Sequence, residues 1–288
     1  MYGISTSAVQ YYRRSQKAPI MGLFLIGLAG LIGIPILAAI YAFLMNVIPF
    51  LIVRILLVLG YPVMCSTIIT AAVKTGKVRN LTLIACAGIF LGLFAEYTSW
   101  IIWIAIVSKE INLLWNFFFP MDTFYLISII AELGAWSFRN ITPTGWVLYL
   151  FWFLEAVIVV GGTAYLTYKV NADTPFCEES DAWAEKKSDI GIFAPIENPV
   201  KFKKELEQTG YSTLNQFAPA QTGNMFTIVQ LYECEKCNNF FVLNIKNQTI
   251  KLDSKGKRQE EYTPIISNLL APSSVVAMIR SLMVKYTT

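Results

Sequence analysis

The sequence contains no histidine and few charged residues. Of its 288 residues, 55% are hydrophobic and only 15% are Asp, Glu, Lys or Arg. The lack of histidine excludes catalytic triads that need an imidazole base, and it excludes histidine-ligated zinc and haem. Because globular domains have about 25% charged residues, the low charged fraction excludes an ordinary soluble domain.

The few charges are divided unevenly between two halves of the chain. Residues 1–170 contain ten Lys or Arg against five Asp or Glu, whereas residues 171–288 contain thirteen against fourteen. The basic excess therefore belongs to the apolar half, where a membrane explains it. In the polar half lysines and glutamates are interspersed, so we expect no nucleic-acid partner.

Four stretches of the first half are long enough to cross a lipid bilayer, which takes about 20 mainly apolar residues. They are approximately residues 20–45, 47–73, 81–107 and 145–168. We therefore expect residues 1–170 to form a domain of four transmembrane helices. Another segment, about residues 120–138, begins with Pro120 and Asp122, and we expect it to form an amphipathic helix at the outer membrane interface.

The orientation follows from basic residues near the ends of the predicted spans. One side has seven of them: Arg13, Arg14, Lys17, Lys74, Lys77, Arg79 and Lys169. The opposite side has only Lys109 and Arg139. The positive-inside rule then places both termini, and the polar half, in the cytoplasm.

Three ionisable residues fall inside the predicted spans, on three different helices. At about 1.5 Å per residue, Arg54, Glu96 and Glu155 lie about 10, 16 and 15 Å from the outer ends of their spans. Charged groups in hydrocarbon are candidates for function. Either Arg54 pairs with the glutamates and stabilises the bundle, or the three groups line an outward-facing cavity. Glu132 and Arg139 of the interfacial segment could cover this cluster.

Six of the seven tryptophans lie between Trp100 and Trp152. This clustering has two interpretations. It indicates an aromatic belt at one membrane surface, or an aromatic pocket beneath the interfacial segment. The residues expected to form such a pocket are Trp100, Trp103, Trp136 and Trp152.

The second half is predicted to contain a linker and a helix in residues 171–224, followed by a β-rich domain in residues 225–288. Hydrophobic alternation predicts strands at residues 225–232, 240–245 and 249–252. A serine N-cap and apolar residues on one helical face predict a final helix at about 273–284. The expected fold class is thus an all-α membrane domain joined to a small C-terminal α+β cytoplasmic domain.

Cys234 and Cys237 form a CxxC motif between the first two predicted strands. In zinc ribbons such a turn directs two thiolates at one point. Cys177 is followed by Ser180, where a second CxxC would have another cysteine, so the domain looks zinc-ribbon-like with an incomplete site. The alternative is zinc bound by Cys177, Cys234 and Cys237, with Asp181, a glutamate or water as fourth ligand.

Four segments, residues 49–60, 131–137, 152–156 and 175–178, resemble a family of uncharacterised bacterial membrane proteins. That family has four membrane helices and a degenerate zinc-ribbon-like cytoplasmic domain. The resemblance extends over most of the chain and implies a multi-pass protein of the bacterial inner (plasma) membrane. It implies no activity.

Two functions from different classes are consistent with these features. The first is a membrane-anchored interaction or assembly protein that presents its cytoplasmic domain to a protein partner. The alternative is a small transporter or lipid-handling protein that uses the Arg/Glu cavity. An enzyme is not favoured, because no strong nucleophile accompanies the carboxylates. Gly88 and Gly92 form a GxxxG motif, which permits close helix contacts within the chain or in a homo-oligomer.

Overall fold

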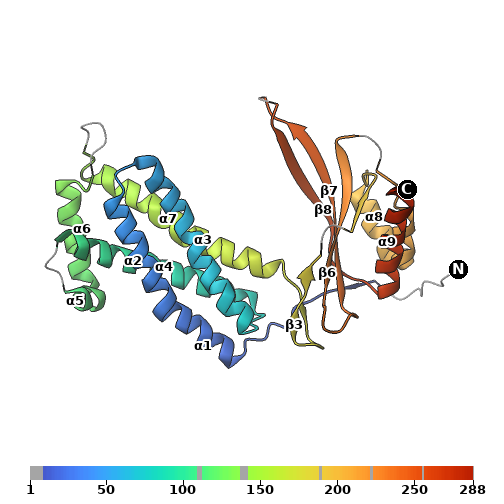
Figure 1. The fold of residues 1–288 in the computed structure, drawn as a ribbon, viewed down its shortest axis with the longest axis horizontal. Helices are drawn as coiled ribbons and strands as arrows, with labels where there is room; N and C mark the ends of the chain where they lie inside the picture. The colour runs from blue at the N-terminus through green and yellow to red at the C-terminus, as the bar shows by residue number, and fades with distance from the viewer. Residues whose placement is uncertain are drawn as a thin grey trace. The chain divides into compact units, whose positions relative to one another are not determined.

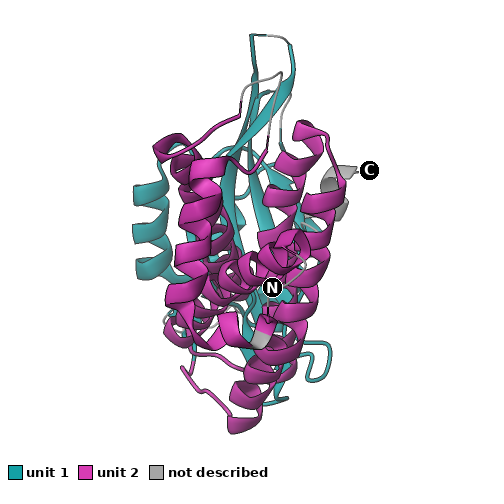
Figure 2. Cartoon of the chain, turned by 90° about the vertical axis from the view of Figure 1, so that its left-hand side faces the viewer, with its two compact units in different colours: residues 1–14, 174–288 teal, residues 15–173 magenta. Residues whose placement is uncertain are grey.

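The computed structural model describes residues 9–108, 112–136, 142–187, 190–220, 223–254 and 256–287. The chain divides into two units, which are coloured separately in Figure 2. Residues 15–173 form the first, which we call the helical unit. Residues 1–14 and 174–288 form the second, which we call the sheet unit.

The helical unit contains four helices that are long and apolar enough to cross a membrane (Figure 1). They comprise residues Ile20–Val47, Leu51–Thr75 (α3), Leu81–Ser108 (α4) and Trp146–Ala172 (α7). The first consists of α1 (Ile20–Leu28), a π-helical turn (Ala29–Gly33) and α2 (Ile34–Val47). Two short helices, α5 (Leu113–Phe118) and α6 (Pro120–Leu133), lie between α4 and α7. The prediction of four long apolar helices is therefore confirmed.

The segment expected to form a helix at about residues 120–138 forms a shorter one. Pro120 lies in the first turn of α6, where its missing N–H leaves no hydrogen bond unmade. The helix ends at Leu133 because Gly134 adopts a φ of 87°. A Cβ at Gly134 would also lie 2.3 Å from Thr142 Cγ2. Residues 137 and 138 lie outside the described residues.

α4 packs closely against α7 through the two glycines of the GxxxG motif. A Cβ added to Gly88 would lie 2.9 Å from the Cα atom of Ala164. A Cβ added to Gly92 would lie 3.1 Å from the Cα atom of Val160. The two contacts run in opposite directions along the two helices, so α4 and α7 are antiparallel and touch backbone to backbone.

α3 runs parallel to α7 and contacts it near the C-terminal ends of both helices. A Cβ added to Gly162 would lie 3.0 Å from Pro62 Cβ. Just over two turns further on, the Asn171 side-chain amide donates a hydrogen bond to Thr70 Oγ1 at 3.2 Å. Each contact joins a residue of α3 to a residue of α7 about one hundred positions later in the chain. Other pairs with this separation therefore lie at the same level of the two helices.

The sheet unit is built on a six-stranded antiparallel sheet. In spatial order its strands are β1 (Gln10–Tyr11), β8 (Arg258–Leu270), β7 (Phe241–Leu252), β6 (Met225–Glu233) and β4 (Glu185–Lys186), and β5 (Gly191–Phe193) also pairs with β6. A separate hairpin consists of β2 (Phe176–Cys177) and β3 (Ala182–Trp183). The unit also contains α8 (Pro199–Thr209), the 3-10 helix η2 (Gly210–Gln216) and α9 (Ser273–Thr287).

The largest apolar cluster of the described sheet unit joins the sheet to its helices. Figure 1 shows α8 and α9 beside the sheet. Leu206 of α8 and Ile279 of α9 are fully buried in this cluster. On the sheet side they belong to one cluster with Val229 of β6 and with Leu243 and Ile245 of β7. The helices therefore cover one face of the three central strands.

Two strands differ from the sequence prediction. The strands expected at residues 240–245 and 249–252 form one continuous strand, β7, because Asn247 between them is not in a turn. Its Oδ1 accepts a hydrogen bond from Thr227 Oγ1 at 2.7 Å. β8 is not predicted from the sequence, since residues 258–261 are polar or charged and residues 258–264 are exposed, which is unfavourable for a strand in isolation.

Residues 174–224, expected as a linker and a helix, lie within the sheet unit. They supply four short strands as well as α8, whose first turn is capped by the Asn198 side chain. The N-terminal strand β1 also joins this sheet by pairing with Leu269 and Leu270. Strands of two or three residues have no periodic pattern of their own, so only their partners in the sheet identify them.

Substituting Gly88 by Ala should destabilise the helical unit, because the new Cβ would push α4 away from α7. We expect a loss of about 1–3 kcal/mol, typical of overpacking in a tight contact. The measurement is thermal or denaturant-induced unfolding of the purified full chain in detergent. Gly161→Ala is the matched control, since none of the described residues lies within 4 Å of a Cβ at that position. Equal stability of the two variants would contradict the close α4–α7 contact.

Candidate functional site

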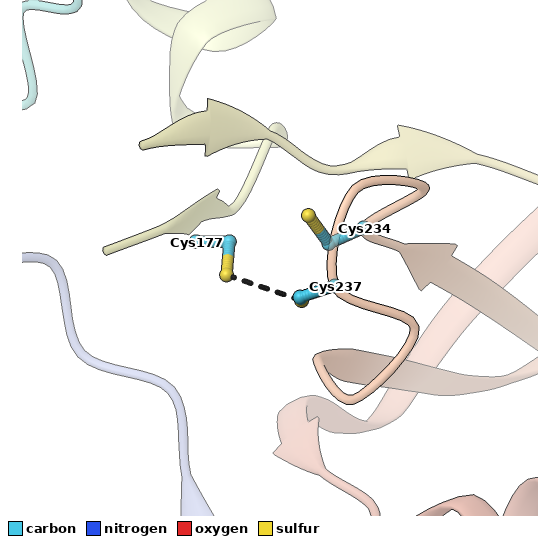
Figure 3. A group of neighbouring side chains, drawn as sticks. All are labelled: Cys177, Cys234 and Cys237. Atoms are coloured by element: carbon cyan, nitrogen blue, oxygen red, sulfur yellow. Dashed lines mark hydrogen bonds between the residues drawn. The ribbon is translucent and has the colours of Figure 1, made fainter. Parts of the chain in front are cut away.

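Three cysteines of the sheet unit converge on one point (Figure 3). Cys177 ends β2, and Cys234 and Cys237 belong to the turn between β6 and β7. Their sulfur atoms all lie within 4.8 Å of one another, and those of Cys177 and Cys237 are 3.7 Å apart. Tetrahedral zinc, with Zn–S bonds of about 2.3 Å, separates two sulfur ligands by about 3.8 Å. The group can therefore hold a metal ion.

The two turns that present these cysteines share one local geometry. In each, the first cysteine, Cys177 or Cys234, accepts hydrogen bonds from the backbone amides two and three residues later. In each, the fourth residue after the first cysteine has a left-handed backbone conformation: Asp181 has a φ of 50° and Asn238 a φ of 53°. Asp and Asn adopt this conformation more readily than most residues, so both turns are built alike.

Ser180 occupies the position in the first turn that Cys237 occupies in the second. Its Oγ lies 2.8 Å from Cys234 Sγ and it also hydrogen-bonds to Cys177. The hydroxyl group therefore contacts two of the three thiols. Among the described residues no carboxylate joins the three sulfurs, so neither Asp181 nor a glutamate completes the group.

The surroundings shift the acidity of two of the thiols in opposite directions. Burial raises the pKa of Cys177 above its usual value. Burial also acts to raise the pKa of Cys234, but hydrogen bonds from the Ser180 hydroxyl and from backbone amides outweigh it and lower the pKa to about 7. The thiolate is the form that binds metal, so the lowered pKa favours metal binding by Cys234 near neutral pH.

The helical unit contains a cavity of about 610 Å³. It is lined by residues of α2, α3, α4 and α7 and by the end of α6 with the residues that follow it. Among the described residues, the charged side chains on its wall are those of Arg54 and Glu155. All four tryptophans of the predicted pocket also line it: Trp100, Trp103, Trp136 and Trp152. Its volume is within the range of about 300–1,000 Å³ typical of small-molecule sites.

The two glutamates are hydrogen-bonded by aromatic side chains. The Tyr41 hydroxyl donates to Glu155 Oε1. The Trp100 indole donates to Glu96 Oε1 at 3.1 Å. Glu96 is buried behind the cavity wall, and its Oε2 has no hydrogen-bond partner in the described part of the chain. The two carboxyl groups are close enough to interact electrostatically.

Arg54 does not pair with either glutamate within the described residues. Its Nε donates instead to the backbone carbonyl of Ile48 at 2.7 Å. The side chain is half-buried and its remaining part lines the cavity. Glu132 is exposed and does not line the cavity, and Arg139 lies outside the described residues.

The tryptophan rings of the cavity pack edge to face. Trp100 contacts Trp103 with ring centroids 5.6 Å apart and Trp152 with centroids 4.8 Å apart. Trp136 packs against the ring of Phe151 at 5.6 Å. Such T-shaped pairs are favoured by the ring quadrupoles, so they stabilise the aromatic part of the wall.

Tyr41 is the functional candidate that the sequence prediction does not include. A tyrosine in an otherwise apolar span carries a hydroxyl that needs a hydrogen-bond partner when buried. That requirement was a usable signal, but the partner, Glu155, lies 114 residues away. Only the packing of α2 in the bundle brings the two groups together.

Comparison of the chain with protein-family models, with curated proteins and with solved structures found no match. The cysteine cluster and the cavity are two distinct candidate sites. The two belong to different units of the chain.

Replacing Tyr41 by Phe should destabilise the helical unit by about 1–3 kcal/mol, because it leaves a buried acceptor of Glu155 without its donor. Unfolding of the purified chain in detergent measures the change. Tyr168→Phe is the control, since Tyr168 is exposed. If both variants unfold like the unaltered protein, the Tyr41–Glu155 hydrogen bond does not contribute to stability.

Proposed function

We propose that this chain is a multi-pass membrane protein that presents a zinc-binding domain to a cytoplasmic protein partner. In this proposal the four long helices span the bacterial inner membrane and the sheet unit lies in the cytoplasm. The observation that supports the proposal most directly is that two equivalent turns bring three thiols together. A small domain gains stability from a structural zinc, and the domain then serves as a rigid binding module.

The distribution of basic residues supports the orientation. Lys74 and Lys77 lie at the end of α3, and Lys169 lies at the end of α7. α3 and α7 are parallel, so these ends are on the same side of the helical unit. The positive-inside rule assigns this side to the cytoplasm.

Three thiolates and one hydroxyl support zinc as the metal. Zinc accepts sulfur ligands in tetrahedral geometry. The Ser180 hydroxyl group contacts two of the three thiols, and either this hydroxyl or a water molecule would complete the coordination. We therefore propose a three-cysteine zinc site with a weak fourth ligand.

A protruding hairpin offers a surface for the partner (Figure 1). β6 pairs with β7 only as far as Thr249, so beyond it β7 and β8 pair only with each other among the described strands. Leu252 is 73% exposed on this hairpin, and Tyr262 is also exposed. Within the part of the chain that the structure describes, the outer edge of β8 pairs with β1 only at Leu269 and Leu270, which leaves backbone groups for an added strand.

The zinc proposal predicts about one zinc ion for each purified full-length chain, as four-coordinate structural sites bind. Cys237→Ser should lose the metal, because it removes one of three strong ligands. Ser180→Cys should bind zinc more tightly against a chelator, because it supplies a fourth thiolate. Elemental analysis and chelator titration measure both effects.

Cys86→Ser is the control for this experiment, since Cys86 is an exposed cysteine of α4. It should keep the full metal content. A zinc content near zero in the unaltered chain would refute the zinc site, as would equal chelator resistance of Ser180→Cys and the unaltered chain.

The partner proposal predicts a discrete crosslinked product from a photoreactive residue at position 252, at the exposed end of β7. The experiment uses cells that produce the full chain, and the product is identified by mass spectrometry. A photoreactive residue at Val200, which is 79% exposed on α8, is the control and should give no such product. The same products from both positions, or none from either, would contradict a partner site on the hairpin.

A further inference from the structure

The cavity of the helical unit lies between the N-terminal parts of α3 and α7. These parallel helices contact each other at Pro62 and Gly162 and again at Thr70 and Asn171. The residues that line the cavity come from earlier positions, 51–59 on α3 and 151–158 on α7. The two helices are therefore in contact towards their C-terminal ends and separated by the cavity towards their N-terminal ends.

The edges of this cavity are exposed apolar side chains. Leu51, Ile55 and Leu59 of α3 line the cavity and are 38%, 51% and 51% exposed. On α7, Leu154 and Ile158 line it and are also exposed. In a helix that spans a bilayer, exposed apolar side chains face lipid. The cavity is thus open sideways towards acyl chains.

Inside the cavity, one positive and one negative group face the same space at the same level. Pro62–Gly162 and Thr70–Asn171 define an offset of about one hundred residues between α3 and α7, so Arg54 lies level with Glu155. The only hydrogen bond of Arg54 to the described residues uses Nε, which leaves its terminal nitrogens for an anion. Tyr41 occupies Glu155 Oε1, which leaves Oε2 for a cation.

The aromatic wall favours a cation beside the carboxylate. Trp100, Trp136 and Trp152 line the cavity together with Glu155. A cation over a tryptophan face is stabilised by the ring quadrupole, and the effect is largest where water is excluded. Arginine, in turn, binds phosphate through its planar guanidinium group.

We propose that this cavity binds the headgroup of a zwitterionic phospholipid, with the phosphate at Arg54 and the ammonium group at Glu155 among the tryptophan rings. The acyl chains leave the cavity between α3 and α7 over the exposed leucine and isoleucine side chains. This inference rests on the proposed membrane location of the helical unit. It assigns the cavity a ligand that contains both charges and an apolar tail.

The test is native mass spectrometry of the full chain in detergent, titrated with phosphatidylethanolamine or with phosphatidylglycerol. Glu155→Gln should weaken phosphatidylethanolamine binding by about tenfold, the effect of losing one charge-assisted hydrogen bond, and should leave phosphatidylglycerol binding unchanged. Arg54→Gln should weaken the binding of both lipids. Glu132→Gln is the matched control for the glutamate and should change neither affinity.

A second pair of variants keeps the test decisive if a charge substitution prevents folding. Trp136→Leu should weaken phosphatidylethanolamine binding, whereas Trp146→Leu should not, because Trp146 is 76% exposed and does not line the cavity. Equal binding by all variants would overturn the proposal. Equally strong competition by free glycerophosphoethanolamine would also overturn it, because the ligand would then need no acyl chain.

Failure of the membrane proposal is detected separately. A membrane-spanning chain stays in the membrane pellet after alkaline extraction, and a peripheral one is released. A chain that stays in the pellet but binds lipid independently of Arg54 and Glu155 refutes the cavity inference alone. A released chain refutes the membrane location and, with it, the lipid site.

Discussion

The close antiparallel contact of α4 with α7 is the constraint on which the cavity depends. Gly88 faces Ala164 and Gly92 faces Val160. The same register, continued for two turns, brings Trp100 of α4 to Trp152 of α7, whose rings are 4.8 Å apart. Glu96 and Glu155 lie between these levels. Small residues at one end of the helix pair thus determine which side chains meet at the other.

The three charged residues inside the predicted spans have aromatic donors or a backbone carbonyl as hydrogen-bond partners. Tyr41 hydrogen-bonds Glu155, Trp100 hydrogen-bonds Glu96, and Arg54 hydrogen-bonds the Ile48 carbonyl. An ion pair between Arg54 and a glutamate would neutralise both charges within the protein. Arg54 and Glu155 have separate neutral partners and both line the cavity, where a ligand of opposite charges can neutralise them.

The sheet unit positions two turns that come from distant parts of the chain. The turn after β2 and the turn after β6 are 57 residues apart at their first cysteines, Cys177 and Cys234. β4 pairs with the end of β6 at Glu185 and Glu233, and this short pairing brings the β2–β3 hairpin next to the CxxC turn. Two-residue strands suffice because the large core between the sheet and its helices supplies the stability.

The sequence alone determined the four long apolar helices, the side with the basic loops, the CxxC turn and the C-terminal helix α9. These features depend on local composition, periodicity and capping, which neighbouring residues specify. Only the tertiary structure decided that Tyr41 binds Glu155, that Arg54 has no carboxylate partner among the described residues, and that charged β8 forms a strand. Each of these depends on contacts between distant segments, and a strand with exposed polar faces is specified by its partner rather than by its own side chains.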